Sequence, residues 1–371
     1  MGDIWSEEGI LSGCGIVGFI SRDGKKFDGS RILKATGVMR ERYNGLGAGF
    51  AGYGIYPNHR DEYCLHVMAE DEKIMIQVSE YLDSRFQIVK DEKIPTGKAI
   101  RDTEPPVFRR FFVNVPEWIL SSLIKRMSPD DYVLRKIRRL HVRFPKAYVF
   151  SSGKNIGVFK GIGYPEEVAQ FFRIENYSGY MWIGHGRYPT NTPGWWGGAH
   201  PFSILGWSVA HNGEISSYGT NKRFVESAGY VCYMLTDTEV ITYLLDLLVR
   251  RHRLSLKTAV KVLTPPRWDE YEKTDNGRNL RILRVVYRSA VLSGPFAVVG
   301  GYSMDGEIGL FAFNDRLKLR PMVVGEGNDG IIAVASEEHA VIELLSKMKR
   351  IWHPKGGELV EVKMESERHG E

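Results

Sequence analysis

The first candidate for chemistry is a cysteine that opens an apolar segment. Cys14 begins CGIVGFI, whose small and β-branched residues predict a short buried strand over 14–20. A thiol attacks a carbonyl carbon as its thiolate, so it needs a base or a lowered pKa. At the start of a chain, the cysteine's own α-amine, with a reference pKa of about 8, can be that base. Thirteen residues precede Cys14, so this chemistry requires their removal, and an inert strand cysteine is the alternative interpretation.

Two further segments are polar where packing alone favours apolar residues. GHGRYPTNTPGWW contains Arg187, whose planar fork suits a carboxylate such as that of an amino acid. AHNGEISSY places Asn212 and Gly213 directly after an apolar strand, where a side-chain NH₂ and a backbone N–H could form an oxyanion hole. The alternatives are a surface arginine and a tight Asn-Gly turn.

A third segment, TDTEV, predicts the start of a helix. Thr236 and Glu239 have the spacing of a capping box. Asp237 then falls in the first turn, where the helix dipole favours the ionised carboxylate. This carboxylate could bind a substrate ammonium group, or it could only decorate the helix end.

The composition narrows the class of protein. With 43% hydrophobic and 26% charged residues, the chain is typical of a globular protein. No apolar run approaches the roughly 20 residues that span a bilayer, and the N-terminus lacks a secretory signal, so we expect a cytoplasmic protein without membrane contact. The densest basic stretch, 135–146, lacks interleaved aromatic residues, so it does not indicate nucleic-acid binding.

The three cysteines, Cys14, Cys64 and Cys232, have no second cysteine or histidine at metal-ligand spacing. An iron–sulfur cluster needs about four cysteine ligands. We therefore expect neither a metal site nor a cofactor in this chain.

The first half of the chain predicts several elements. The apolar spacing over 31–43 is that of a helix, and a glycine-dense loop is expected from there through Gly54. Within that loop 47–52 matches G-x-G-x-x-G, but no helix pattern follows, so a dinucleotide site is not indicated. The composition changes over about 60–130, which we interpret as an inserted, mostly α+β segment. AYVFSSGKNIGVFKGIG predicts a hairpin that turns at 153–155.

In the second half, helices are expected at 165–173, 237–251 and 254–263, and YMWIGHGRY and FSILGWSVAHNG read as strands. The last third predicts five more strands, in PFAVVGGYS, IGLFAFN, PMVVGE, GIIAVAS and GELVEVKM, with a final helix capped by Ser336. Strand-rich blocks at both ends with helices between them favour two packed sheets with helices on their outer faces.

Taken together, these segments resemble the class II (N-terminal nucleophile) glutamine amidotransferases, and most closely the amidotransferase domain of glutamate synthase. CGIVGFI is similar to the family's opening strand, GHGRYPTNT, HPF and AHNGEISSYGTNKRFVESAGY to its glutamine loop and oxyanion segment, and TDTEVI to its amino-group binder. The resemblance is closest from 185 to 239. It implies an α+β fold, the four-layer αββα sandwich. It also implies a leader or propeptide over 1–13 and one amidotransferase domain over 14–371, with the insertion at about 60–130.

The resemblance also implies roles for single residues. Cys14 would be the nucleophile, with its freed α-amine as the base. Asn212 and Gly213 would stabilise the oxyanion, Arg187 would bind the glutamine carboxylate, and Asp237 would bind its ammonium group.

Two more residues, Thr190 and His185, would shape the glutamine pocket in the same comparison. The implied reaction is hydrolysis of glutamine through a cysteinyl thioester. Its ammonia would pass to a separate synthase subunit, in the first place of glutamate synthase, which would carry FMN and iron–sulfur clusters.

Two alternatives stay open. The first is an amidotransferase that serves another acceptor, such as an amino sugar, a phosphoribosyl group or a methylamine-derived amino acid. The second is a non-catalytic subunit that binds or docks glutamine and keeps its leader.

Overall fold

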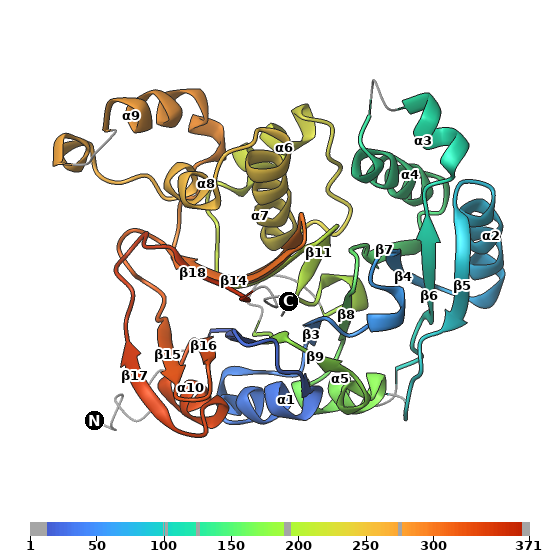
Figure 1. Ribbon diagram of the computed structural model, residues 1–371, viewed down its shortest axis with the longest axis horizontal. Helices are drawn as coiled ribbons and strands as arrows, with labels where there is room; N and C mark the ends of the chain where they lie inside the picture. Colours follow the sequence, from blue (N-terminus) through green and yellow to red (C-terminus); the bar gives the residue numbers. More distant parts are fainter. Residues whose placement is uncertain are drawn as a thin grey trace, which may run out of the picture.

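The computed structural model describes residues 13–98, 100, 103–123, 127–188, 194–273 and 277–365 of the 371-residue chain. Its strands form two large antiparallel sheets that face each other, with helices on both outer faces and a smaller sheet at one side (Figure 1). Within the described ranges, no helix is long and apolar enough to cross a membrane.

The larger sheet has seven strands, and the strand that follows Cys14 is its middle one. Every residue of this strand is buried, because it is paired on both edges and covered on both faces. The order across the sheet is β17 (Met348–Trp352), β15 (Val323–Gly327), β16 (Ile331–Ala335), β1 (Gly15–Ser21), β10 (Met181–Gly186), β3 (Ala48–Tyr53) and β8 (Ile156–Gly161). A two-stranded pair, β2 (Phe27–Asp28) and β9 (Ser178–Gly179), completes this part of the fold.

The second sheet has five strands and packs against the first. Along its central strand, Ala297 and Val299 join the apolar core between the two sheets, whereas Val298 joins the core beneath the helices. This alternation is the period of two that a strand with both faces covered requires. The order is β11 (Phe202–Ile204), β12 (Trp207–Gly213), β13 (Phe296–Met304), β14 (Glu307–Asn314) and β18 (Val360–Lys363).

Helices cover both outer faces. The seven-stranded sheet carries α1 (Gly29–Gly37), α5 (Pro165–Phe172) and α10 (Glu338–Leu344). The other side carries α6 (Tyr218–Ser227), α7 (Asp237–Leu245) with its π-helical continuation η5 (Asp246–Arg251), α8 (Leu256–Leu263) and α9 (Gly277–Val286). Short 3₁₀ turns lie at Arg40–Arg42, Pro57–His59, Ile174–Asn176, Trp196–Gly198, Trp268–Lys273 and Arg288–Ala290. The predicted αββα arrangement is confirmed.

A third sheet occupies the flank of the sandwich (Figure 1). Its strands are β5 (Gln87–Lys93), β6 (Val107–Asn114), β4 (Tyr63–Ala69) and β7 (Ala147–Ser151), in that order. Helices α2 (Glu72–Asp83), α3 (Glu117–Leu123) and α4 (Pro129–Arg143) belong to the same segment. The mixed helix and strand content expected over 60–130 is present, and the sheet extends beyond it to β7. That the segment is an insertion stays a prediction.

Two local predictions are wrong for the same reason, the demands of tertiary packing. The glycine-dense stretch at 47–52 is not a loop but lies largely in β3, a buried strand of the large sheet. A Cβ atom at Gly49 would lie 2.3 Å from His200 O, so glycine serves close packing here. The segment 147–161 is not a hairpin, because β7 pairs with β4 in the small sheet while β8 pairs with β3 in the large one.

Smaller differences concern element ends. The first helix begins at Gly29 and ends at Gly37, so it covers only part of 31–43, and FSILGWSVAHNG is two strands, β11 and β12, not one. Ser336 does not cap the last helix, whose N-cap is Glu337. Ser336 Oγ instead accepts a hydrogen bond of 3.2 Å from Ile16 N, which fastens the start of β1.

Gly49→Ala is expected to lower the free energy of unfolding by roughly 1–3 kcal/mol, because the added methyl group overpacks a rigid backbone contact. Gly37→Ala is the matched control, since nothing lies within 4 Å of its Cβ position. Urea unfolding of both variants measures the difference. Equal stability of the two variants would contradict the close packing of β3.

Candidate active site

Cys14 lies at the entrance of β1, directly beside the end of β10. Gly15 pairs with Gly186 in the antiparallel register, so Arg187 and Tyr188 follow at the level of Cys14. A Cβ atom on either glycine would lie 2.3–2.7 Å from the Tyr43 ring, which therefore packs directly against this pair of strands. Tyr188 N donates a hydrogen bond of 3.3 Å to Cys14 Sγ.

The charges around Cys14 come from two of the predicted binding residues. Loss of hydration raises the pKa of the Cys14 thiol, although the residue as a whole stays partly exposed. The backbone N–H of Tyr188 and the guanidinium of Arg187 oppose this shift, and Asp237 adds to it. The net pKa is raised, so the thiol holds its proton unless a base removes it.

Asp237 is the first residue of α7, as the sequence predicted. Thr236 caps this helix by accepting a hydrogen bond from Glu239 N at 3.2 Å. The carboxylate of Asp237 accepts a hydrogen bond of 3.1 Å from Ile215 N and lies 3.5 Å from His211 Nδ1. Burial raises the pKa of Asp237, but His211 and the backbone donors outweigh it and hold the pKa below its usual value. Asp237 is therefore an anion at neutral pH.

Asn212 and Gly213 are the last residues of β12, so they do not form a tight turn. They pair with Ala297 and Phe296 of β13. Gly213 has φ +127°, and a Cβ atom there would lie 2.0 Å from Pro295 O, so only glycine fits. Asn212 is fully buried, and within the described residues its side-chain Nδ2 and Oδ1 have no hydrogen-bond partner. A buried amide without partners costs about 1–3 kcal/mol, which a ligand could recover.

The residue before Cys14 lies against this amide. The Cβ position of Gly13 is 3.3 Å from Asn212 Oδ1 and 3.2 Å from Arg320 Nη1. Gly13 therefore lies close to the predicted oxyanion donor.

Behind these residues is a stack of three buried histidine rings. The rings of His185 and His200 are 4.1 Å apart and stacked, and His211 continues the stack at 6.3 Å. Thr238 Oγ1 lies 3.1 Å from His200 Nε2 and 3.3 Å from His211 Nδ1. Burial lowers the pKa of His185 and of His200 well below its usual value, so both rings are neutral. His185 thus supports the site from behind.

A buried lysine and glutamate lie further back. Lys160 Nζ donates to Gly197 O at 2.9 Å, and burial lowers the pKa of Lys160 to about 7. Burial raises the pKa of Glu239 to about 7. The Glu239 carboxylate accepts hydrogen bonds from the backbone N–H groups of residues 233–235 and from the Tyr243 hydroxyl, at 3.0–3.2 Å. The capping-box pattern correctly predicted Thr236 as the N-cap of this helix. The side chain of Glu239, however, binds the backbone of the 233–235 loop instead of the backbone of the N-cap residue.

The structure brings together Cys14, Arg187, Asp237, Asn212 and Gly213, and it places His185 in the layer behind them. Thr190 lies outside the described residues. Among those residues, no group of three or more His, Cys, Asp or Glu side chains could hold a metal ion.

Sequence reasoning missed the supporting layer: His200, His211, Thr238 and Lys160. Lys160 did leave a signal, since a charged residue inside the apolar run IGVFKG requires a buried partner. The sequence shows that HPF and AHNG contain histidines, but it does not show that their rings stack. The stacking depends on a contact between β10, β12 and the segment before β11.

A family model described as glutamine amidotransferases class-II matches residues 56–369, and the chain belongs to this family. The match begins after β3, so Cys14 lies outside it. The chain is 45% identical over 352 residues to an uncharacterized protein of Archaeoglobus fulgidus, covering 94% of this chain and 91% of that one. It is 28% identical over 224 residues to an amidophosphoribosyltransferase of Methanocaldococcus jannaschii, covering 57% of this chain and 39% of that one.

A shorter similarity links the chain to another relative. Over 149 residues the chain is 33% identical to a glutamine–fructose-6-phosphate aminotransferase of Sulfurisphaera tokodaii, covering 38% of this chain and 25% of that one. The class II resemblance inferred from the motifs is confirmed.

Lys160→Met is expected to remove a pH dependence of stability. The pKa of Lys160 falls from 10.5 in the unfolded chain to about 7 in the fold. The unfolded chain therefore binds more protons between these values, and the free energy of unfolding rises with pH there, by up to about 1.4 kcal/mol per pH unit. Urea unfolding between about pH 7 and pH 9 measures this slope.

Lys34→Met, at an exposed position of α1, is the control and should keep the wild-type slope. Because the pKa of Glu239 is raised, its own contribution falls as pH rises from 4.5 to about 7, outside the measured window. An unchanged slope in Lys160→Met would show that this ammonium is not buried in the fold.

Proposed function

We propose that this chain hydrolyses glutamine at Cys14 once residues 1–13 have been removed. The observation that carries the proposal is the convergence of four elements on one point. The start of β1 supplies Cys14, the end of β10 supplies Arg187, the end of β12 supplies Asn212, and the start of α7 supplies Asp237. A cation and an anion beside one thiol match the carboxylate and ammonium groups of an amino acid.

The proposed reaction uses the freed α-amine of Cys14 as the base, because burial keeps the thiol protonated. The amine takes the thiol proton, and the sulfur attacks the side-chain amide carbon of glutamine. Asn212 Nδ2 and the Gly213 N–H stabilise the oxyanion of the tetrahedral intermediate. The C–N bond breaks as the amine returns the proton to the leaving ammonia. Water then hydrolyses the γ-glutamyl thioester to glutamate and the free thiol.

The leader bears directly on this mechanism. While Gly13 is attached, the nitrogen of Cys14 is a peptide nitrogen and cannot act as a base, and Gly13 itself lies against Asn212. Removal of 1–13 would supply the base and clear the oxyanion position in one step. A chain that keeps its leader fits the alternative, a subunit that binds glutamine without hydrolysing it.

Cys14→Ala is expected to reduce ammonia release from glutamine by roughly a thousandfold or more, because it removes the nucleophile. Cys64→Ala is the control, since Cys64 lies in β4 of the small sheet. Mass spectrometry of the wild-type chain from its own cells should find Cys14 as the first residue. Equal ammonia release by wild type and Cys14→Ala would refute the role of this sulfur, and a retained leader without ammonia release would favour the binding subunit.

For the acceptor, we propose a separate synthase of glutamate synthase type, which would carry FMN and iron–sulfur clusters. Support comes from the resemblance of 185–239 to the amidotransferase domain of glutamate synthase. The competing proposal is another acceptor, such as a phosphoribosyl group or an amino sugar. Its support is the similarity to the amidophosphoribosyltransferase and the fructose-6-phosphate aminotransferase reported above.

Affinity purification of the tagged chain from its own cells separates these proposals. The first predicts a co-purifying subunit with the absorption spectrum of a flavin and the iron and sulfide content of clusters. A co-purifying enzyme without flavin or iron, which aminates a phosphosugar when glutamine is added, would instead establish the second. Ammonia release by the isolated chain tests the glutaminase step independently of the partner.

A further inference from the structure

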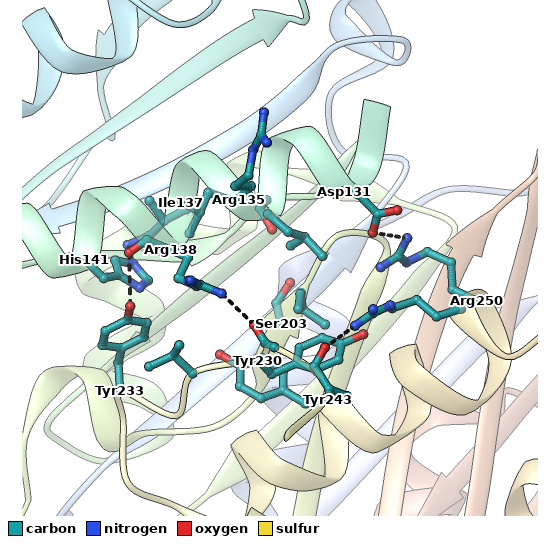
Figure 2. Close-up of a pocket in the computed structure, with 18 of the residues that line it drawn as sticks. Asp131, Arg135, Ile137, Arg138, His141, Ser203, Tyr230, Tyr233, Tyr243 and Arg250 are labelled. Carbon is teal, nitrogen blue, oxygen red and sulfur yellow. Dashed lines mark hydrogen bonds and ion pairs between the residues drawn. The ribbon is translucent and has the colours of Figure 1, made fainter. Parts of the chain in front are cut away.

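A pocket opens on the flank of the molecule, and Cys14 is not among the residues that line it. It has a volume of about 380 Å³ and lies between α4, the segment 228–233 and the end of α7 with η5 (Figure 2). Cys14, Arg187, Asn212 and Asp237 do not line it. Its size is within the range of small-molecule sites, about 300–1,000 Å³.

The mouth of this pocket carries two arginines from different helices. Arg138 Nη1 donates to Gly229 O at 3.1 Å, and Arg251 Nη1 donates to Ala228 O at 2.6 Å. These carbonyls belong to successive residues, so both guanidinium groups are held at the edge of the pocket by the same short segment. Within the described ranges neither is paired with a carboxylate, unlike Arg250, which binds Asp246. The remaining N–H donors of the two forks are suited to an anion with several oxygens.

The inner end of the pocket offers uncharged hydrogen-bonding groups. His141 Nε2 accepts a hydrogen bond of 2.9 Å from Val149 N, so the ring proton sits on Nδ1. His141 is more than nine-tenths buried, and its Nδ1 has no partner among the residues that the structure describes. Ser203 Oγ, on a half-buried residue, also has no hydrogen-bond partner among the described residues. Burial lowers the pKa of His141 to about 3, so this ring is a neutral donor.

Aromatic rings form the wall between the two ends. Tyr230 and Tyr243 are stacked with centroids 5.2 Å apart, and Tyr233 meets His141 edge to face at 4.5 Å. Figure 2 shows Arg138 and His141 of α4 facing Tyr230 and Tyr233 across the pocket. We propose that this pocket binds a small metabolite with a planar ring and a phosphate group, the phosphate on Arg138 and Arg251 and the ring among the tyrosines.

Binding of a ligand in this pocket would also affect the proposed glutamine site. This link between the two sites rests on the proposed function. The backbone N–H of Tyr233 and the hydroxyl of Tyr243 both donate to the Glu239 carboxylate at 3.0 Å. The same segment continues through Thr236 into Asp237, the proposed ammonium binder. A ligand that orders 228–235 would therefore lower the KM for glutamine.

A purely structural role is the competing explanation for the two arginines. Ala228 and Gly229 follow the C-terminus of α6, where cations are favourable to the helix dipole. That role predicts no ligand binding, so titration calorimetry of the full chain distinguishes the two. Phenyl phosphate is the probe, because it joins one ring to one phosphate, and inorganic phosphate is the comparison.

Wild type is expected to bind phenyl phosphate saturably and at least tenfold more tightly than inorganic phosphate. Arg251→Gln should weaken binding at least tenfold, whereas Arg139→Gln, an exposed arginine of α4 that does not line the pocket, should bind as wild type does. Arg138→Lys keeps the charge but loses the fork, so an intermediate affinity is expected if it folds as wild type. No saturable binding to wild type, or equal binding by Arg251→Gln and Arg139→Gln, overturns the site.

The KM for glutamine, measured with and without saturating phenyl phosphate, tests the link to Asp237. We expect the KM to fall about threefold or more in wild type and to stay unchanged in Arg251→Gln. Binding without any change in KM overturns the link and leaves the site. Because calorimetry needs no glutaminase activity, failure of the proposed function would be recognised separately.

Discussion

The pairing of β1 with β10 places Cys14 beside Arg187, and the other site residues take their positions around these two. The pairing is close because both strands have glycine where the Tyr43 ring covers them, at Gly15 and Gly186. A side chain at either position would displace the Tyr43 ring, and we expect this to shift the Cys14 thiol relative to the Arg187 guanidinium. One backbone register therefore sets the positions of the proposed nucleophile and of the proposed carboxylate binder.

The layer behind the site is polar although it is buried. Three buried histidine rings stack between the two sheets, with Thr238 bridging His200 and His211. Behind them, Lys160 and Glu239 have pKa values that burial has moved toward neutrality from opposite directions. Buried titratable groups destabilise the fold unless they are hydrogen-bonded or paired. Their presence therefore favours a functional role for this region over a role in packing alone. Their bonds to the 233–235 backbone and to Gly197 hold the loops that surround the site.

The segment 228–236 links the pocket beside α4 to the residues around Cys14. At one end it receives Arg138 and Arg251, and at the other it runs into the N-cap of α7 and Asp237. The Glu239 carboxylate binds the middle of this segment through three backbone N–H groups. One carboxylate, with a pKa of about 7, thus holds the loop that the proposed metabolite site and the proposed glutamine site share.

The sequence by itself determined the strand after Cys14 and the capped helix at Asp237, and it suggested which residue types would serve as the proposed nucleophile, carboxylate binder and oxyanion donors. These features depend on local periodicity, capping and chemistry, which neighbouring residues specify. Only the tertiary structure decided that Gly49 belongs to a buried strand, that β7 and β8 enter different sheets, and that Asn212 ends a strand instead of forming a turn. Only it revealed the histidine stack and the Lys160–Glu239 layer. The reason is physical: these features arise from contacts between residues far apart in the chain. A local pattern such as the lysine inside IGVFKG indicates that a buried partner is needed, but it does not identify that partner.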